Sequence, residues 1–171
     1  MTGGLRVAGT FTTAAEKLPY LAKLGVNMIE LMPVATFCDQ ADGWGYNPCA
    51  PYAVMNAFGG YKGLKMFVNA AASYGIGVML DVVWNHADSG NILEKFDTYG
   101  GTAGNGIYFY EGSTTAETLW GPRPAYDTPQ VVDYILGACS RRRATGGGAG
   151  AHHKGRGGVS MCSRLHPDVA V

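Results

Sequence analysis

An acidic residue interrupts one of the most aliphatic runs of the chain, and two polar residues follow soon after it. The run Ile76–Val83 is nearly continuous in aliphatic residues apart from Asp81, and Asn85 and His86 come next. A carboxylate in such a run is costly to bury unless it is paired. Asp81 alone could equally cap a loop, and His86 alone is more typical of a locally satisfied histidine. Their close spacing favours a functional site.

Aromatic residues accompany these polar groups. Aromatic faces cover the apolar C–H face of a sugar ring well, while neighbouring polar groups bond the ring hydroxyls. The chain offers four candidates for such platforms, namely Trp44, Tyr46, Trp84 and Trp120. The alternative, at least as good for any single one of them, is that they pack long loops against the rest of the fold.

Three aliphatic segments predict strands that would position these residues. They are Leu5–Phe11, Val26–Val34 and Ile76–Val83. The segment from Ala35 to about Tyr61, rich in turn-forming residues, is predicted to be a loop, and so are residues 87–127.

Helical periodicity lies between and after these segments. Thr13 with Glu16 fits a capping box, and a leucine stripe beginning at Leu18 predicts a helix that stops at Gly25. A second stripe ends at Gly75 and consists of Leu64, Phe67, Val68 and Ala71. A third helix is predicted from Pro129 to Cys139.

The order strand, helix, strand, helix, strand with short links indicates right-handed crossovers and a parallel α/β sheet. In such sheets, functional residues gather at the carboxyl ends of the strands. Tyr46 follows the second predicted strand, and Asp81 to His86 end the third. The predicted site therefore has contributions from two neighbouring strand ends.

The last 32 residues differ from the rest in charge. Residues 1–139 hold 7 Lys/Arg and 12 Asp/Glu, whereas residues 140–171 hold 6 basic residues and Asp168 alone. They are glycine-rich without hydrophobic periodicity, so we expect a disordered tail. It is interpreted as a solvated tail or the product of a shifted reading frame or unspliced segment. A basic arm for nucleic acid or a membrane surface is not favoured, since no helix or aromatic interleaving organises its charges.

Cysteine usage and hydropathy limit the other classes. The four cysteines form no C-x-x-C pair, which disfavours a zinc site, and reduced thiols are expected. No window is apolar enough to span a membrane, and no signal peptide is recognised. We expect an intracellular protein, of cytoplasm or plastid, without a membrane partner.

Three segments resemble the α-amylase superfamily, glycoside hydrolase family 13. Glu16–Val34 is similar to its first helix and second strand, Trp44–Pro48 to its aromatic loop, and Asp81–His86 to its first signature region. Gly106–Tyr110 and Trp120–Pro124 resemble branching enzymes and trehalohydrolases. The resemblance covers about residues 5–139. It implies the first three βα units of a truncated (β/α)8 TIM barrel that acts on α-glucans such as starch or glycogen.

The resemblance also implies roles for single residues. Tyr46 would stack on the sugar at the cleavage subsite, His86 would bond its hydroxyls, and Asp81 would orient neighbouring groups. Asn85 occupies a position that holds structural calcium in many amylases, so a Ca²⁺ ion is an optional expectation and no cofactor is required. The resemblance gives no role to Trp84 or to Asp88. Trp44 and Trp84 join the predicted substrate-binding set only because of their aromatic side chains.

The catalytic carboxylates that the resemblance calls for are missing. Retaining glycosidases use a nucleophile and an acid/base about 5–5.5 Å apart. In the family these come from the fourth and fifth strands, and residues 140–171 contain no Gly-Phe-Arg-x-Asp-like segment. We therefore expect a fragment of a 1,4-α-glucan branching enzyme-like protein that is inactive alone. The alternatives are an α-glucan hydrolase (amylase, debranching or trehalohydrolase-like) and a non-catalytic glucan-binding fragment.

Overall fold

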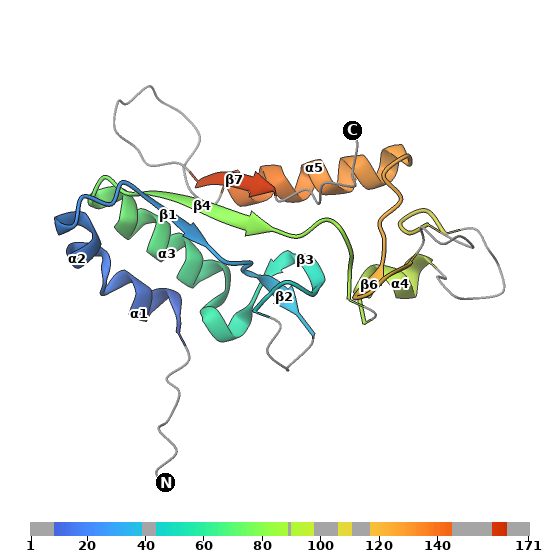
Figure 1. The fold of residues 1–171 in the computed structure, drawn as a ribbon, viewed down its shortest axis with the longest axis horizontal. Coiled ribbons are helices and arrows are strands. Elements are labelled where there is room, and N and C mark those ends of the chain that lie inside the picture. The colour runs from blue at the N-terminus through green and yellow to red at the C-terminus, as the bar shows by residue number, and fades with distance from the viewer. Residues whose placement is uncertain are drawn as a thin grey trace, which may run out of the picture.

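The computed structural model describes residues 9–38, 44–88, 90–97, 106–110, 117–144 and 159–163. Its main sheet has three parallel strands in the order β1–β4–β7 (Figure 1). These strands are β1 (Met28–Leu31), β4 (Gly77–Val82) and β7 (Val159–Ser163). The predicted parallel α/β arrangement of the second and third segments is therefore confirmed. Within the described residues this sheet does not close into a barrel.

The first helical region begins earlier than the sequence predicts. Helix α1 (Phe11–Ala15) is capped by Thr10, whose side chain accepts from the Thr13 backbone while the Thr13 side chain accepts from Thr10. The predicted box of Thr13 and Glu16 is therefore wrong, and Phe11 is helical rather than the end of a strand. Residues 5–8 of that predicted strand lie outside the described residues. Helix α2 (Leu18–Lys23) follows, and Gly25 ends it at a φ of 82°.

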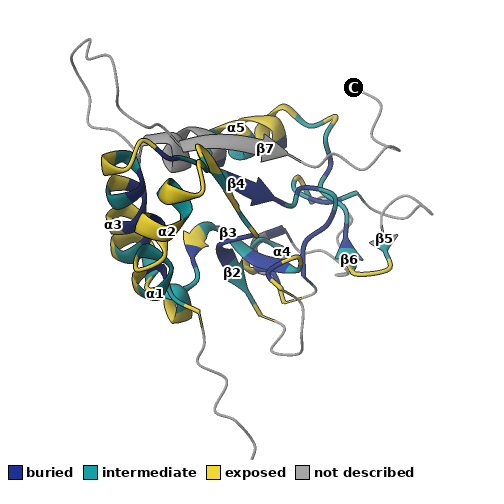
Figure 2. Ribbon diagram, turned by 60° about the vertical axis from the view of Figure 1, so that its left-hand side comes forward, coloured by how far each residue is buried: buried dark blue, intermediate teal, exposed yellow. Residues whose placement is uncertain are grey.

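Helix α3 (Gly60–Ser73) carries the predicted apolar stripe. A short 3-10 helix (Asn56–Phe58) leads into it, and Gly75 at a φ of 71° follows it. Its side chains pack on β4 to form the core, which includes Leu64, Phe67, Val68, Ala71, Val78 and Leu80. Figure 2 shows β4 buried, with exposed stripes on the outer sides of α1, α2 and α3. This packing fixes the position of β4 and therefore of Asp81 near its carboxyl end.

The segment that follows β1 contains strands that were predicted to be a loop. Strands β2 (Ala35–Phe37) and β3 (Pro48–Val54) pair antiparallel with register shifts. Prolines within β3 make its sequence look like a loop. A two-stranded sheet tolerates them because both of its strands are edge strands, in which some backbone N–H groups have no partner strand to donate to. A disulfide joins Cys38 and Cys49, with Cα atoms 5.6 Å apart. The expectation of reduced thiols is wrong for Cys38 and Cys49. Cysteine usage therefore no longer supports the predicted intracellular location.

The region after β4 is mostly irregular, as predicted, with short elements. They are helix α4 (Ile92–Asp97) and the small antiparallel pair β5 (Glu117–Thr118) and β6 (Gly121–Pro122). The buried Asp97 carboxylate accepts from the backbone N–H groups of Ile107, Tyr108 and Phe109. It thereby holds the 106–110 segment against α4.

The C-terminal region departs from the prediction of a disordered tail. Helix α5 (Pro129–Ala144) crosses the expected boundary at residue 139, and β7 pairs with β4 from Val78 to Val82. The prediction is wrong for residues 140–144 and 159–163, because β4 has an edge whose backbone groups gain partners from β7. The other tail residues lie outside the described set. No helix of the described ranges is long and apolar enough to cross a membrane.

Candidate functional site

Asp81 and Tyr46 meet at the carboxyl end of β4. The Tyr46 hydroxyl donates to Oδ2 of Asp81 at 2.7 Å, so two residues 35 positions apart in sequence share one hydrogen bond. Asp81 is only 3% exposed, whereas Tyr46 is 37% exposed. The second carboxylate oxygen of Asp81 is buried without a hydrogen-bond partner. The pair thus has one oxygen engaged, one oxygen available, and an aromatic ring that reaches solvent.

The backbone before Tyr46 adopts an unusual conformation. Trp44 has a φ of 51° and Gly45 a φ of 86°, both in the left-handed region. A Cβ at position 45 would lie 2.4 Å from the carbonyl oxygen of Pro33, which follows β1. Only glycine fits at position 45. The left-handed φ of Trp44 is strained, because a bulky residue rarely adopts it. Strain of this kind persists where surrounding contacts enforce it and is common at functional sites.

Asp88 connects the Tyr46 segment to the loop after β4. Its Oδ2 accepts from Nδ2 of Asn47 at 2.7 Å, and its backbone N–H donates to the carbonyl of Pro48 at 3.0 Å. Asp88 is buried, with 8% of its surface exposed. Sequence reasoning assigned it no role. The available signal was its distance of two residues from Gly90, a spacing typical of an Asx-turn.

His86 lies near Tyr46 and is also buried. The amide of Asn85 contacts its Nδ1 at 3.3 Å, and its ring lies near that of Trp120, with centroids 5.4 Å apart. Burial lowers the pKa of His86, opposed by the Tyr46 backbone and the Asp88 carboxylate. His86 is therefore neutral near pH 7, a state in which one ring nitrogen donates and the other accepts. Its Nε2 is buried without a partner.

The two other predicted aromatic platforms occupy different environments. Trp84 is 6% exposed and belongs to the hydrophobic core, which is the packing role considered in the sequence. Trp44 is 69% exposed and lines a separate open hollow of about 560 Å³ with Met32 and Phe58. Pro33 borders both this hollow and the one beside Asp81. The structure thus joins Tyr46 to Asp81 and places His86 near Tyr46 and Trp120, whereas Trp84 lies in the core and Trp44 lines the larger hollow.

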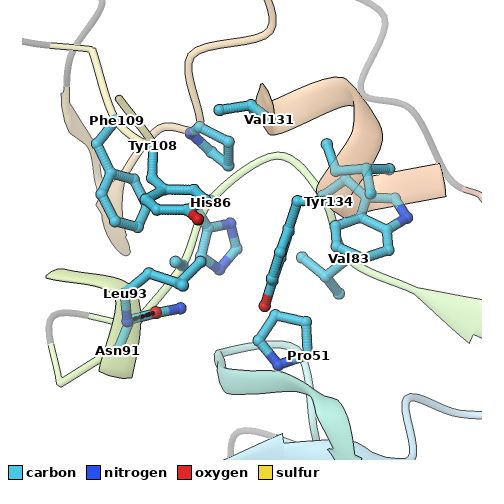
Figure 3. A pocket seen from close by; sticks show the side chains of 13 residues that line it. Pro51, Val83, His86, Asn91, Leu93, Tyr108, Phe109, Val131 and Tyr134 are labelled. Atoms are coloured by element: carbon cyan, nitrogen blue, oxygen red, sulfur yellow. Dashed lines mark hydrogen bonds between the residues drawn. The ribbon is translucent and has the colours of Figure 1, made fainter. Parts of the chain in front are cut away.

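A small apolar pocket lies behind His86 (Figure 3). Its volume is about 20 Å³, and its walls include Pro51, Val83, Asn91, Tyr108 and Tyr134. The hollow beside Asp81 is about 10 Å³. Each could hold a single water molecule at most, not a sugar ring. Within the residues that the structure describes, Tyr46 is the partly exposed member of this group, and Asp81 and His86 are buried.

The described residues do not assemble an evident metal centre. No group of three or more His, Cys, Asp or Glu side chains within the described ranges could hold an ion. Nδ2 of Asn85, the predicted calcium position, contacts His86. Calcium at Asn85 stays a prediction.

Comparisons with known proteins agree with the geometry. The family profile "Alpha amylase, catalytic domain" matches residues 2–105. A malto-oligosyltrehalose trehalohydrolase of Deinococcus radiodurans is 41% identical over 130 residues, covering 75% of this chain and 20% of the relative. The 1,4-alpha-glucan branching enzyme GlgB 2 of Xanthomonas euvesicatoria pv. vesicatoria is 34% identical over 132 residues, covering 74% and 17%.

A solved structure is similar as well. The crystal structure of a proposed alpha amylase from Salmonella typhimurium matches with a TM-score of 0.67 and 39% identity, over 80% of this chain and 21% of that one. The chain spans about a fifth of the length of the curated relatives and of the solved structure.

Proposed function

The chain belongs to the alpha-amylase family, glycoside hydrolase family 13, and we propose that it supplies part of the glucan-binding cleft of an α-glucan-active enzyme. The observation that carries this proposal is the hydrogen bond from Tyr46 to Asp81 at the carboxyl end of β4. It joins a partly exposed aromatic ring to a buried carboxylate at the edge of a parallel sheet where ligands commonly bind.

Each of the three residues has a distinct part in this proposal. The Tyr46 ring stacks on the apolar face of a glucosyl unit, an interaction that needs the ring held at a fixed angle. Asp81 holds the Tyr46 hydroxyl and retains one oxygen to orient further polar groups. His86, neutral because burial lowers its pKa, can exchange hydrogen bonds with sugar hydroxyls.

Two reactions are candidates for the enzyme as a whole. The relatives at 41% identity carry the name malto-oligosyltrehalose trehalohydrolase, which favours hydrolysis of an α-glucan. The branching-enzyme relative at 34% identity favours transfer of a glucan segment as the second candidate. Both start from the same kind of chain, so the Tyr46 surface serves either reaction.

A polypeptide of these 171 residues is proposed to bind glucan without turning it over. Retaining cleavage needs two carboxyl groups about 5–5.5 Å apart on either side of the bond. The segments that resemble the family assign neither carboxyl group to this sequence. Amylose should therefore remain intact after incubation with the pure polypeptide, and release of reducing sugar that is lost on Asp81→Ala would contradict this.

Affinity electrophoresis in amylose gels tests the binding proposal. We expect the chain to be retarded by amylose, and Tyr46→Ala to remove the retardation because the stacking ring is lost. Tyr20→Ala is the matched control, since Tyr20 is an exposed tyrosine (62%) on α2. Migration of the wild-type chain that amylose does not slow would overturn the proposal.

Competition distinguishes the two reactions. Malto-oligosyltrehalose and a maltooligosaccharide of equal length are added to the gel in turn. Stronger competition by the trehalose-ended sugar supports the trehalohydrolase-like assignment. Equal competition favours the branching-like assignment, for which a trehalose end has no significance.

A further inference from the structure

We propose that Asp88 is a positioning residue, which holds the Tyr46 ring against Asp81 through Asn47 and so shapes the sugar-binding surface. The glucan-binding part of this inference rests on the proposed function, whereas the positioning part does not. It assigns a role to a residue that lies outside the Tyr46–Asp81–His86 group.

Three hydrogen bonds converge on Asp88. Oδ2 accepts from Nδ2 of Asn47 at 2.7 Å, Oδ1 accepts from the backbone of Gly90 at 2.6 Å, and the Asp88 N–H donates to Pro48 at 3.0 Å. Asn47 and Pro48 are the two residues directly after Tyr46. Two of the three bonds thus restrain the chain immediately beyond the stacking ring.

The Tyr46 segment needs such a restraint. On the other side of Tyr46, Trp44 and Gly45 are both left-handed, and Gly45 is pressed against the carbonyl of Pro33. A strained backbone relaxes unless contacts on both sides hold it. Pro33 provides the contact on one side and Asp88 provides it on the other, so the Tyr46 hydroxyl meets Asp81.

The carboxylate form of Asp88 suits this task. Ionised oxygens make hydrogen bonds shorter and stronger than neutral ones, and here both oxygens are used. Asp88 is 8% exposed, so losing one bond leaves a polar group buried without a partner. A role limited to the Asx-turn with Gly90 is the competing explanation. It predicts that changes at Asn47 leave Tyr46 unaffected.

An exchange of the two side chains separates these explanations. In Asn47→Asp two carboxylates face each other, and the hydrogen bond becomes a repulsion. In Asp88→Asn the side chain retains one oxygen, which can accept from Gly90 or Asn47 but cannot serve both as the carboxylate does. In the double variant Asn47→Asp/Asp88→Asn, the new amide donates to position 47 while its oxygen accepts from Gly90. The double variant restores both bonds: donor and acceptor are exchanged between positions 47 and 88, and Gly90 still donates to residue 88.

Two readouts are needed so that positioning and binding can be judged separately. The ¹³Cζ resonance of Tyr46, assigned by its loss in Tyr46→Phe, reports the hydrogen bond to Asp81 without any ligand. Retardation in amylose gels reports glucan affinity. Asp97→Asn is the matched control, because Asp97 is also a buried carboxylate that accepts backbone hydrogen bonds, but it holds the 106–110 segment. Thermal unfolding confirms that each variant is folded.

We expect Asn47→Asp and Asp88→Ala to shift the Tyr46 resonance toward its position in Asp81→Ala and to weaken amylose affinity about tenfold, the loss of one charged hydrogen bond. The double variant regains both, and Asp97→Asn changes neither. A Tyr46 resonance that stays at its wild-type position in Asn47→Asp and Asp88→Ala would overturn the inference, as would a folded double variant without recovery. If amylose does not retard the wild-type chain while the Tyr46 resonance responds as expected, the positioning role of Asp88 is supported and the proposed function is wrong.

Discussion

Replacing Gly45 with alanine tests whether the contact between Gly45 and Pro33 sets the binding loop. The new Cβ would meet two costs at once. At a φ of +86° an L-residue loses about 1–2 kcal/mol, and at 2.4 Å from the Pro33 oxygen the methyl group overlaps backbone that must move. Overpacking of this kind typically costs about 1–3 kcal/mol. The total expected loss of unfolding free energy is therefore about 2–5 kcal/mol.

Gly25→Ala provides the matched control. Gly25 has nearly the same φ, +82°, but nothing lies within 4 Å of its added Cβ. It should carry only the conformational cost of about 1–2 kcal/mol, which lowers the Tm by roughly 2–8 °C in a chain of this size. The difference between the two variants isolates the contact with Pro33.

Thermal unfolding and amylose gels together provide the assay. We expect Gly45→Ala to unfold at a lower temperature than Gly25→Ala and to bind amylose more weakly, because displacing the loop moves Tyr46 away from Asp81. Gly25→Ala should bind amylose as the wild type does. Equal Tm values together with equal amylose binding in the two variants would refute the reasoning about the loop.

Three further predictions concern the disulfide, His86 and the predicted calcium position at Asn85. Reduction of the Cys38–Cys49 disulfide, whose cysteines are 11 residues apart, should lower the unfolding free energy by about 2–3 kcal/mol through loop entropy, and dithiothreitol should not affect the Tm of Cys38→Ser/Cys49→Ser. Burial lowers the pKa of His86 below 6.5 in the folded chain, so as the pH falls the unfolded chain takes up a proton at this histidine before the folded chain does. The free energy of unfolding is therefore largest at neutral pH and decreases as the pH drops below about 6.5. In a profile of Tm against pH, His86→Gln should lose less stability below pH 6.5 than the wild type does. Dialysis against EDTA tests the predicted calcium position: an ion held at Asn85 would make the Tm fall on dialysis and recover with added Ca²⁺, because calcium bound by oxygen ligands stabilises the folded chain, and an unchanged Tm would contradict that prediction.

Periodicity in the sequence predicted the central α/β elements well. The stripe of α3 and the aliphatic run of β4 bury continuous surfaces, and such surfaces leave a clear mark on composition. Gly25 and Gly75 marked helix ends because both adopt a positive φ. These features depend on local chemistry, so one sequence reveals them.

Features that depend on distant partners were predicted less well. Strands β2 and β3 were missed because prolines break their pattern, and their stability comes from pairing and from the disulfide between Cys38 and Cys49. Strand β7 was missed because its order comes from the edge of β4 rather than from its own composition.

The site shows the same division. The motif around Asp81 to His86 indicated a site at the end of β4, and the Tyr46–Asp81 hydrogen bond agrees with the expectation that these two side chains lie together. Asp88 was overlooked because its partners Asn47 and Gly90 only become neighbours in the fold. The burial of Trp84 shows that an aromatic next to a motif can belong to the core.

The most direct test of the central claim is an NMR titration of the chain, labelled on its tyrosine rings, with a maltooligosaccharide. We expect saturable shifts of the Tyr46 ring resonances in the wild-type chain, and no such shifts in Asp81→Ala, where the ring has lost its hydrogen-bond partner. Saturable binding that leaves the Tyr46 resonances unmoved would contradict the claim that this ring, held by Asp81, receives the sugar.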